Sequence, residues 1–229
     1  LICAAIFGNA GYRDYETNMH PLIFTTPIKP ASYYSGRFLG SFFLTIFIQL
    51  GITLGLAIGF LMPYLDQDAI GIFRLDAYLH PIFVMVIPNV FLVGAILFSL
   101  AILSRRMLPT YLASVILLFG YLTSSNLTSD IETRWIASLL DPFGGEAISD
   151  LVKYWTPSER DTLLIPLGKW LVFNRVIWLF VGAFFFLFGM KKFSFSKEYK
   201  LFNLKRDKSS QTAEEEVFQS SEVLSLIHI

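Results

Sequence analysis

The residue types that most often perform chemistry in proteins are few in this sequence and lie far apart. Its single cysteine is Cys3, and its three histidines, His20, His80 and His228, belong to no HExxH pattern. A catalytic zinc needs about three such ligands close together, so we expect no metal site and no catalytic residues. The chain also lacks a GxxxxGK[ST] phosphate-binding loop. We therefore predict that it is not an enzyme and binds no cofactor itself.

Long uncharged stretches indicate the fold class. Hydrophobic residues make up 54% of the 229 residues and charged residues only 16%, compared with about 25% charged residues in soluble domains. A helix needs roughly 20 apolar residues to cross a bilayer. Such stretches lie at 38–65, 77–104 and 107–129, with shorter ones at 176–190 and 1–7. We predict an all-α polytopic bundle of four complete transmembrane spans and one truncated span, and we interpret the chain as a fragment cut within a helix.

The stretch 176–190 is too short to span a bilayer at about 1.5 Å per residue. We expect its helix to extend back through Trp170 and Arg175, with the Arg175 guanidinium reaching the lipid headgroups. Before it we predict an extracytoplasmic amphipathic helix at 146–155. Its apolar residues at helical spacing are Ile148, Leu151, Val152 and Trp155. This stripe either lies on the membrane surface or packs against neighbouring spans.

Basic residues are distributed unevenly between the connections. Twelve Lys and Arg residues lie in 8–37, in 104–107 and after residue 190, and six lie in the opposite connections. By the positive-inside rule we expect the three segments that carry the twelve basic residues to be cytoplasmic. We expect the polar tail 193–229 to be cytoplasmic and disordered, and we interpret its apolar end, 224–229, as artefactual. The net charge of +0 argues against a nucleic-acid partner.

The predicted cytoplasmic segment 9–37 combines aromatic residues, prolines and charges. Its first half can form a short amphipathic helix with Tyr12, Tyr15 and Met19 on one side, and its prolines prevent one long helix. Along it runs the pattern R-x-x-E-T, L-x-x-T-x-P and Y-x-x-G-R. The matching residues are Arg13, Glu16, Thr17, Leu22, Thr25 or Thr26, Pro27, Tyr33 or Tyr34, Gly36 and Arg37. This pattern resembles the membrane-spanning permease subunits of ABC-2 type transporters.

The resemblance implies that residues 1–192 form a permease domain without its first span, in a multi-pass protein of the bacterial inner membrane. In that family the segment is a coupling helix that rests on a separate ABC ATPase subunit, which binds ATP and Mg²⁺. The implied contact residues are Arg13, Tyr15, Glu16, Thr17, Leu22, Thr25 and Pro27. The other implied partners are a second permease half, identical or different, and membrane lipids. The implied function is ATP-driven export.

A narrower resemblance leaves two alternatives to transport open. The strings LDPFG (140–144), YWTPSER (154–160) and NRVIW (174–178) are similar to ABC-2 permeases whose polypeptide continues into an M1-type aminopeptidase. The HExxH motif of that peptidase is absent from these 229 residues. The chain can therefore be a membrane anchor for a C-terminal M1-type metallopeptidase domain, or a membrane scaffold that transports nothing.

Small and polar residues within the predicted spans suggest helix contacts. Gly51, Gly55 and Gly59 form GxxxGxxxG, which fits either the seam between two permease halves or packing within one half. Gln49 and Asn89 are amides within apolar stretches, and Pro88 frees a backbone carbonyl and bends its helix. These residues line a substrate pathway or join helices. No buried Asp, Glu or Lys lies near a span centre, which argues against a proton- or sodium-coupled carrier.

Overall fold

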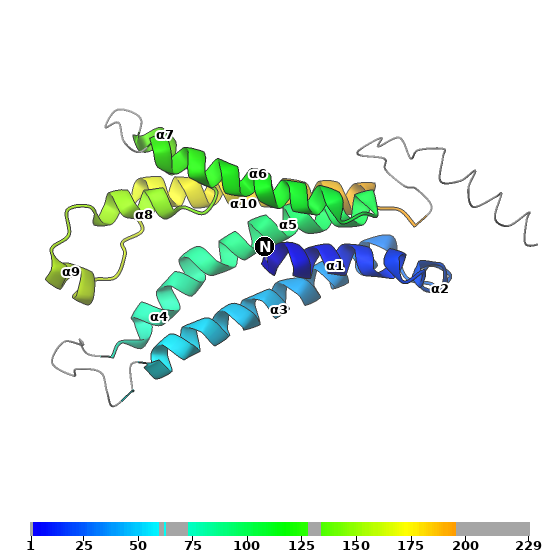
Figure 1. Ribbon diagram of the computed structural model, residues 1–229, viewed down its shortest axis with the longest axis horizontal. Helices are drawn as coiled ribbons and strands as arrows, with labels where there is room; N and C mark the ends of the chain where they lie inside the picture. Colours follow the sequence, from blue (N-terminus) through cyan, green and yellow to red (C-terminus); the bar gives the residue numbers. More distant parts are fainter. Residues whose placement is uncertain (1, 60–61, 63–72, 128–133, 196–229) are drawn as a thin grey trace, which may run out of the picture. The chain divides into compact units, whose positions relative to one another are not determined.

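The computed structural model describes residues 2–59, 62, 73–127 and 134–195 (Figure 1). Within these residues every regular element is helical, which confirms the all-α fold class. The elements are α1 (Ile2–Glu16), α2 (His20–Phe24), α3 (Pro30–Gly59), α4 (Leu75–Pro81), the π-helical turn η1 (Ile82–Val86), α5 (Ile87–Ser104), α6 (Leu108–Leu127), α7 (Arg134–Leu140), α8 (Gly145–Val152), α9 (Pro157–Thr162) and α10 (Lys169–Lys192). The predictions for the tail from residue 196 onward lie outside the described residues.

Three helical segments are long and apolar enough to cross a membrane: Pro30–Gly59, Leu75–Ser104 and Lys169–Lys192. The last begins at Lys169, which confirms that the helix of the 176–190 stretch extends back through Trp170 and Arg175. The apolar part of α6, Leu108–Thr123, is shorter than these three segments. The total of four complete spans stays a prediction.

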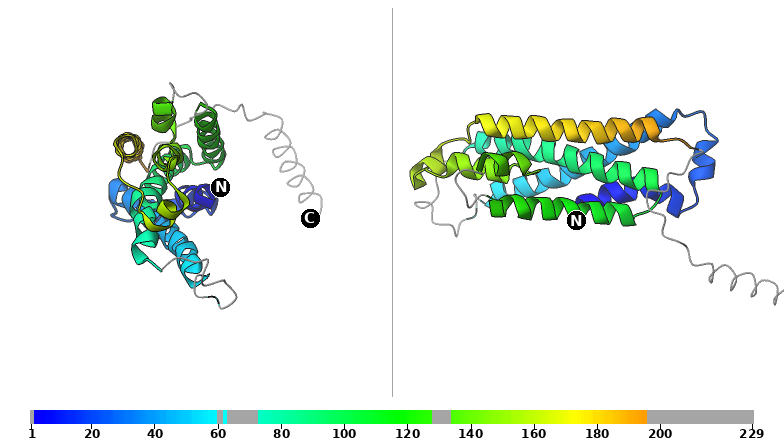
Figure 2. Two further views of the ribbon diagram at one scale, coloured as in Figure 1. Left: turned by 90° about the vertical axis from the view of Figure 1, so that its left-hand side faces the viewer. Right: turned by 90° about the horizontal axis from the view of Figure 1, so that it is seen from above.

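Helix α5 is the centre of the bundle. It packs against α10, α1, α6 and α3 (Figures 1 and 2). Most of its residues are buried. Small residues allow this close approach: a Cβ on Gly94 would overlap the Phe7 ring of α1, and one on Gly11 would lie 2.9 Å from Cβ of Ala101. Close backbone contact of this kind holds membrane helices together by dispersion forces.

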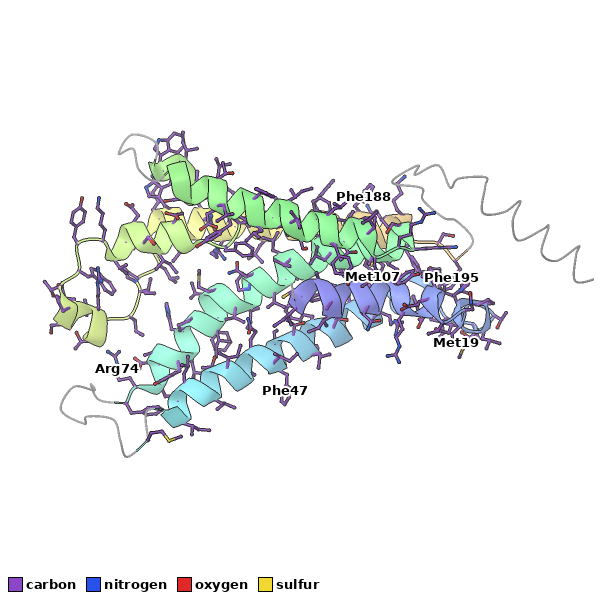
Figure 3. All side chains as sticks on the ribbon, in the orientation of Figure 1. Met19, Phe47, Arg74, Met107, Phe188 and Phe195 are labelled. Atoms are coloured by element: carbon purple, nitrogen blue, oxygen red, sulfur yellow. The ribbon has the colours of Figure 1, made fainter. Side chains whose placement is uncertain are left out.

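Aromatic side chains join the first half of α3 to α5 and α10. The Phe38 ring centre lies 5.8 Å from that of Phe98 and 4.7 Å from that of Phe186. The buried Tyr34 hydroxyl is hydrogen-bonded to Ser99 Oγ at 2.7 Å. The second half of α3 is exposed instead, and Phe47 points away from the bundle (Figure 3). The two halves of α3 therefore differ in how much of the bundle they touch.

The helix that begins at Leu75 changes its hydrogen-bond pattern at η1, between Pro81 and Pro88. Neither proline has an N–H to donate, so two backbone hydrogen bonds of a regular α-helix are missing within eight residues. A π-helical turn is one way for a helix to absorb such an interruption. The irregular turn lies on the N-terminal side of Pro88.

Candidate functional site

The residues between Arg13 and Pro27, here named the 13–27 segment, connect α1 to α3 through α2. At its start the buried carboxylate of Asp14 accepts a hydrogen bond from the Tyr33 hydroxyl at 2.5 Å and pairs with the Arg37 guanidinium at 2.5 Å. Tyr33 and Arg37 both belong to α3. One carboxylate thus ties the end of α1 to the first two turns of α3.

A second set of contacts ties the 13–27 segment to the ends of α5 and α10. The Arg105 guanidinium, directly after α5, lies 4.7 Å from the ring centre of Tyr15. Burial raises the pKa of the Tyr15 phenol, and the Arg105 charge opposes this rise. The Phe24 ring of α2 stacks on Phe195 at 4.2 Å, and Arg105 Nη2 donates to the Phe195 carbonyl at 3.1 Å. Phe195, which follows α10, therefore packs with the bundle.

The backbone turns sharply between α1 and α2. Asn18 adopts a left-handed conformation with φ of 54°, and Pro21 lies in the first turn of α2. The expectation that Met19 shares one helical face with Tyr12 and Tyr15 is wrong, because α1 ends at Glu16 and the Met19 side chain is 48% exposed. Met19 lies beside α2 in Figure 3.

Most of the expected ATPase-contact residues lie on the outer side of the 13–27 segment. Six of the seven are exposed, and the Leu22 side chain is 65% exposed. The exposed six are Arg13, Glu16, Thr17, Leu22, Thr25 and Pro27. Tyr15 is half-buried and faces the bundle, so it anchors the segment. The sequence pattern did not single out Asp14 and Phe24, because each becomes an anchor only through a partner distant in the sequence.

The opposite end of the bundle is organised by a buried arginine. Arg175 of α10 is only 8% exposed. Its Nη1 donates to Asn89 Oδ1 at 2.6 Å, and its Nη2 donates to Asn174 Oδ1 at 2.7 Å. The expectation that Arg175 reaches the lipid headgroups is therefore wrong. The two amides supply acceptors inside the protein, and the Asp141 carboxylate lies close enough to stabilise the cation.

The LDPFG loop closes over this arginine. Asp141 accepts hydrogen bonds from the backbone N–H groups of Phe143 at 2.8 Å and Glu146 at 2.9 Å. Asn174 Nδ2 donates to the carbonyls of Ser138 and Asp141, both at 2.7 Å. These contacts join the α7–α8 connection to α10 and satisfy polar groups that would otherwise be buried without partners.

Asn89 and Gln49 differ in their surroundings. Asn89 links α5 to the loop, because its Nδ2 donates to the Phe143 carbonyl at 3.1 Å while its Oδ1 accepts from Arg175. This geometry favours the interpretation of Asn89 as a residue that joins helices. Gln49 is half-buried, and its side-chain amide makes no hydrogen bond with a described residue.

The GxxxGxxxG glycines pack closely against no residue that the structure describes. A Cβ placed on Gly51, Gly55 or Gly59 would meet no described atom within 4 Å. This favours the seam between two permease halves over packing within one half, and the seam stays a prediction. The tightly packed glycines are others: a Cβ on Gly189 would overlap the Tyr34 hydroxyl, and one on Gly182 would lie 3.2 Å from Cα of Leu92.

The amphipathic helix ends at Val152, earlier than the predicted boundary at 155. Its apolar stripe faces other parts of the same chain. Ile148, Val152 and Trp155 line a groove against α4, and the Leu151 side chain lies so close to Gly168 that a Cβ there would overlap it. The interpretation of this stripe as packing against neighbouring elements is therefore favoured.

Comparisons with protein-family models, with curated proteins and with solved structures find no match for this chain. Among the described residues, no group of three or more His, Cys, Asp and Glu side chains lies close enough to hold a metal ion.

Proposed function

We propose that this chain is the membrane-spanning permease subunit of an ATP-driven ABC-2 type exporter in the bacterial inner membrane. In this proposal the 13–27 segment docks on a separate ABC ATPase subunit, which binds ATP and Mg²⁺. The observation that carries the proposal is the two-sided construction of that segment. Asp14, Tyr15 and Phe24 fix one side to the bundle, while Glu16 and Leu22 are exposed on the other.

Such a construction suits the transmission of movement. The anchored side contacts α3, the residue that follows α5 and the residues that follow α10. A displacement of the segment therefore acts on three long helices together, whereas a flexible loop would absorb it. ATP binding shifts the bundle only if the closed ATPase binds one arrangement of these helices more tightly than the other. The exposed Glu16 carboxylate is suited to pair with a basic side chain of the ATPase.

The second permease half is proposed to contact the exposed half of α3. Gly51, Gly55 and Gly59 lie there with open space beside them, and backbone approach across such glycines is a common basis of helix association in membranes. Either an identical chain or a different one can supply the facing helix. Membrane lipids cover the remaining apolar surface.

The test is a charge-reversal substitution at Glu16, made in the organism whose genome encodes this chain. Tagged protein carrying Glu16→Lys is purified in mild detergent beside the unchanged protein and beside Asp150→Lys, a charge reversal on α8 at the opposite end of the bundle. We expect a co-purifying protein with a GxxxxGK[ST] loop, retained by the unchanged chain and by Asp150→Lys and reduced about tenfold by Glu16→Lys, as the loss of one charge-assisted contact predicts. Equal recovery of that ATPase with all three chains would overturn the coupling role of Glu16.

A further inference from the structure

A groove with a volume of about 530 Å³ lies at the end of the bundle that carries α8 and α9. Its walls come from α4, from α8 and from the chain between Lys153 and Ile165. The apolar part of the lining includes Ile148, Val152 and Leu164. The groove is large enough to hold part of a lipid or another small amphiphile.

The position of α4 indicates the level of the groove along the bundle. Ala77, His80 and Pro81 line it, and all three lie near the beginning of Leu75–Ser104, a helix long and apolar enough to cross a membrane. The first residues of such a helix lie where the hydrocarbon core meets the headgroups. The groove is therefore placed at the depth of the lipid headgroups and the upper acyl chains.

The described ionisable side chains of the lining are all basic. They are His80, Lys153 and Arg160, and no carboxylate is among the described side chains that line the groove. None of the three forms an ion pair with a described residue, and the Lys153 amine lies 5.3 Å from the ring centre of Tyr154. Unpaired basic groups beside an apolar wall complement a molecule with an anionic head and an apolar tail.

We propose that this groove binds an anionic phospholipid of the surrounding bilayer. The phosphate would face Lys153 and Arg160, and an acyl chain would lie along Ile148 and Val152. This inference does not rest on the proposed transport function, because a membrane anchor or scaffold with the same groove would bind the same lipid.

Trp155 in the lining provides the probe for the test. The protein is reconstituted in phosphatidylcholine vesicles, and part of the lipid is replaced by phosphatidylglycerol or phosphatidylcholine with brominated acyl chains, which quench nearby tryptophans. Subtracting the fluorescence of a Trp155→Phe variant isolates the signal of Trp155. At about fivefold for Lys153 and about threefold for Arg160, we expect half-maximal quenching by the glycerol lipid at a mole fraction about 15-fold lower than by the choline lipid.

Two variants decide whether the groove is responsible. Lys153→Gln combined with Arg160→Gln is expected to abolish the preference, and Arg160→Gln alone, at an exposed position, to reduce it about threefold. Lys169→Gln removes an exposed basic group at the same end of the bundle but outside the groove, and is expected to leave the preference unchanged. Equal quenching of Trp155 by both brominated lipids overturns the proposal. A preference that survives the double substitution, or one that Lys169→Gln reduces equally, also overturns it.

Discussion

The contact between Gly144 and Arg175 gives the most specific stability prediction for this fold. Gly144 has φ of 75°, and a Cβ at this position would overlap Nη2 of the Arg175 guanidinium. Replacement by alanine therefore has two costs. A side chain in the left-handed conformation costs about 1–2 kcal/mol, and weakening hydrogen bonds of a buried guanidinium costs about 1.5–3 kcal/mol. We expect Gly144→Ala to lower the free energy of unfolding by about 2.5–5 kcal/mol.

The neighbouring glycine is a matched control. A Cβ on Gly145 would approach Asp141 Oδ2 at 3.5 Å, an ordinary contact, and Gly145 already begins α8. Gly145→Ala should therefore change the unfolding free energy by no more than about 0.5 kcal/mol. The assay is reversible unfolding in mixed micelles by titration with sodium dodecyl sulfate, followed by circular dichroism.

A double substitution separates the two costs. In a chain that already carries Arg175→Ala, no guanidinium remains for the new Cβ to overlap. Gly144→Ala should then lower the free energy of unfolding only by the cost of the left-handed conformation, about 1–2 kcal/mol. Equal unfolding free energies for Gly144→Ala and Gly145→Ala would refute the packing of Arg175 against this loop.

Asp14→Asn weakens the link between α1 and α3 and should lower the unfolding free energy by about 1–3 kcal/mol, whereas Glu16→Gln at an exposed position should not change it; equal values would contradict the anchor. Gly189→Ala should cost about 2 kcal/mol in the same titration because α3 and α5 leave no room for a Cβ, while Gly51→Ala should leave the isolated chain unchanged. Hydrogen bonds from the residue before α9 hold the pKa of Glu159 below its ordinary value. The stabilisation of α9 by these hydrogen bonds is fully present above the ordinary glutamate pKa and is lost as the pH falls through the lowered pKa of Glu159. The Glu159 carboxyl resonance should therefore titrate below the ordinary glutamate range in an NMR pH series.

The helical plan is largely readable from the sequence because it depends on local properties. Uncharged stretches long enough to cross a bilayer anticipated the helices that contain Phe38 and Asn89, and the shorter stretch 176–190 anticipated α10. Proline has no N–H to donate, so Pro21 and Pro30 mark the points where new helices begin. These features need no information about distant partners.

The contacts that organise the two ends of the bundle are not readable in the same way. Arg175 is buried because Asn89, 86 residues earlier, supplies an acceptor, and no local pattern reveals that pairing. The close packing at particular glycines also depends on residues that are distant in the sequence. Gly189 belongs to no small-residue repeat, yet Tyr34 and Ser99 lie directly beside it. A repeat identifies a face that can approach another helix, whereas the tertiary structure decides which glycines are used.

Photo-crosslinking tests our proposal that the exposed side of the 13–27 segment binds an ABC ATPase. The most direct measurement replaces Leu22, which is 65% exposed, with a photo-crosslinking amino acid in the native cell. The control places the same amino acid at Tyr154, which is 83% exposed and lies at the opposite end of the bundle. We expect a cross-link from position 22 to a protein with a GxxxxGK[ST] loop, and none to that protein from position 154. Cross-links from position 22 that include no such ATPase would contradict the proposal.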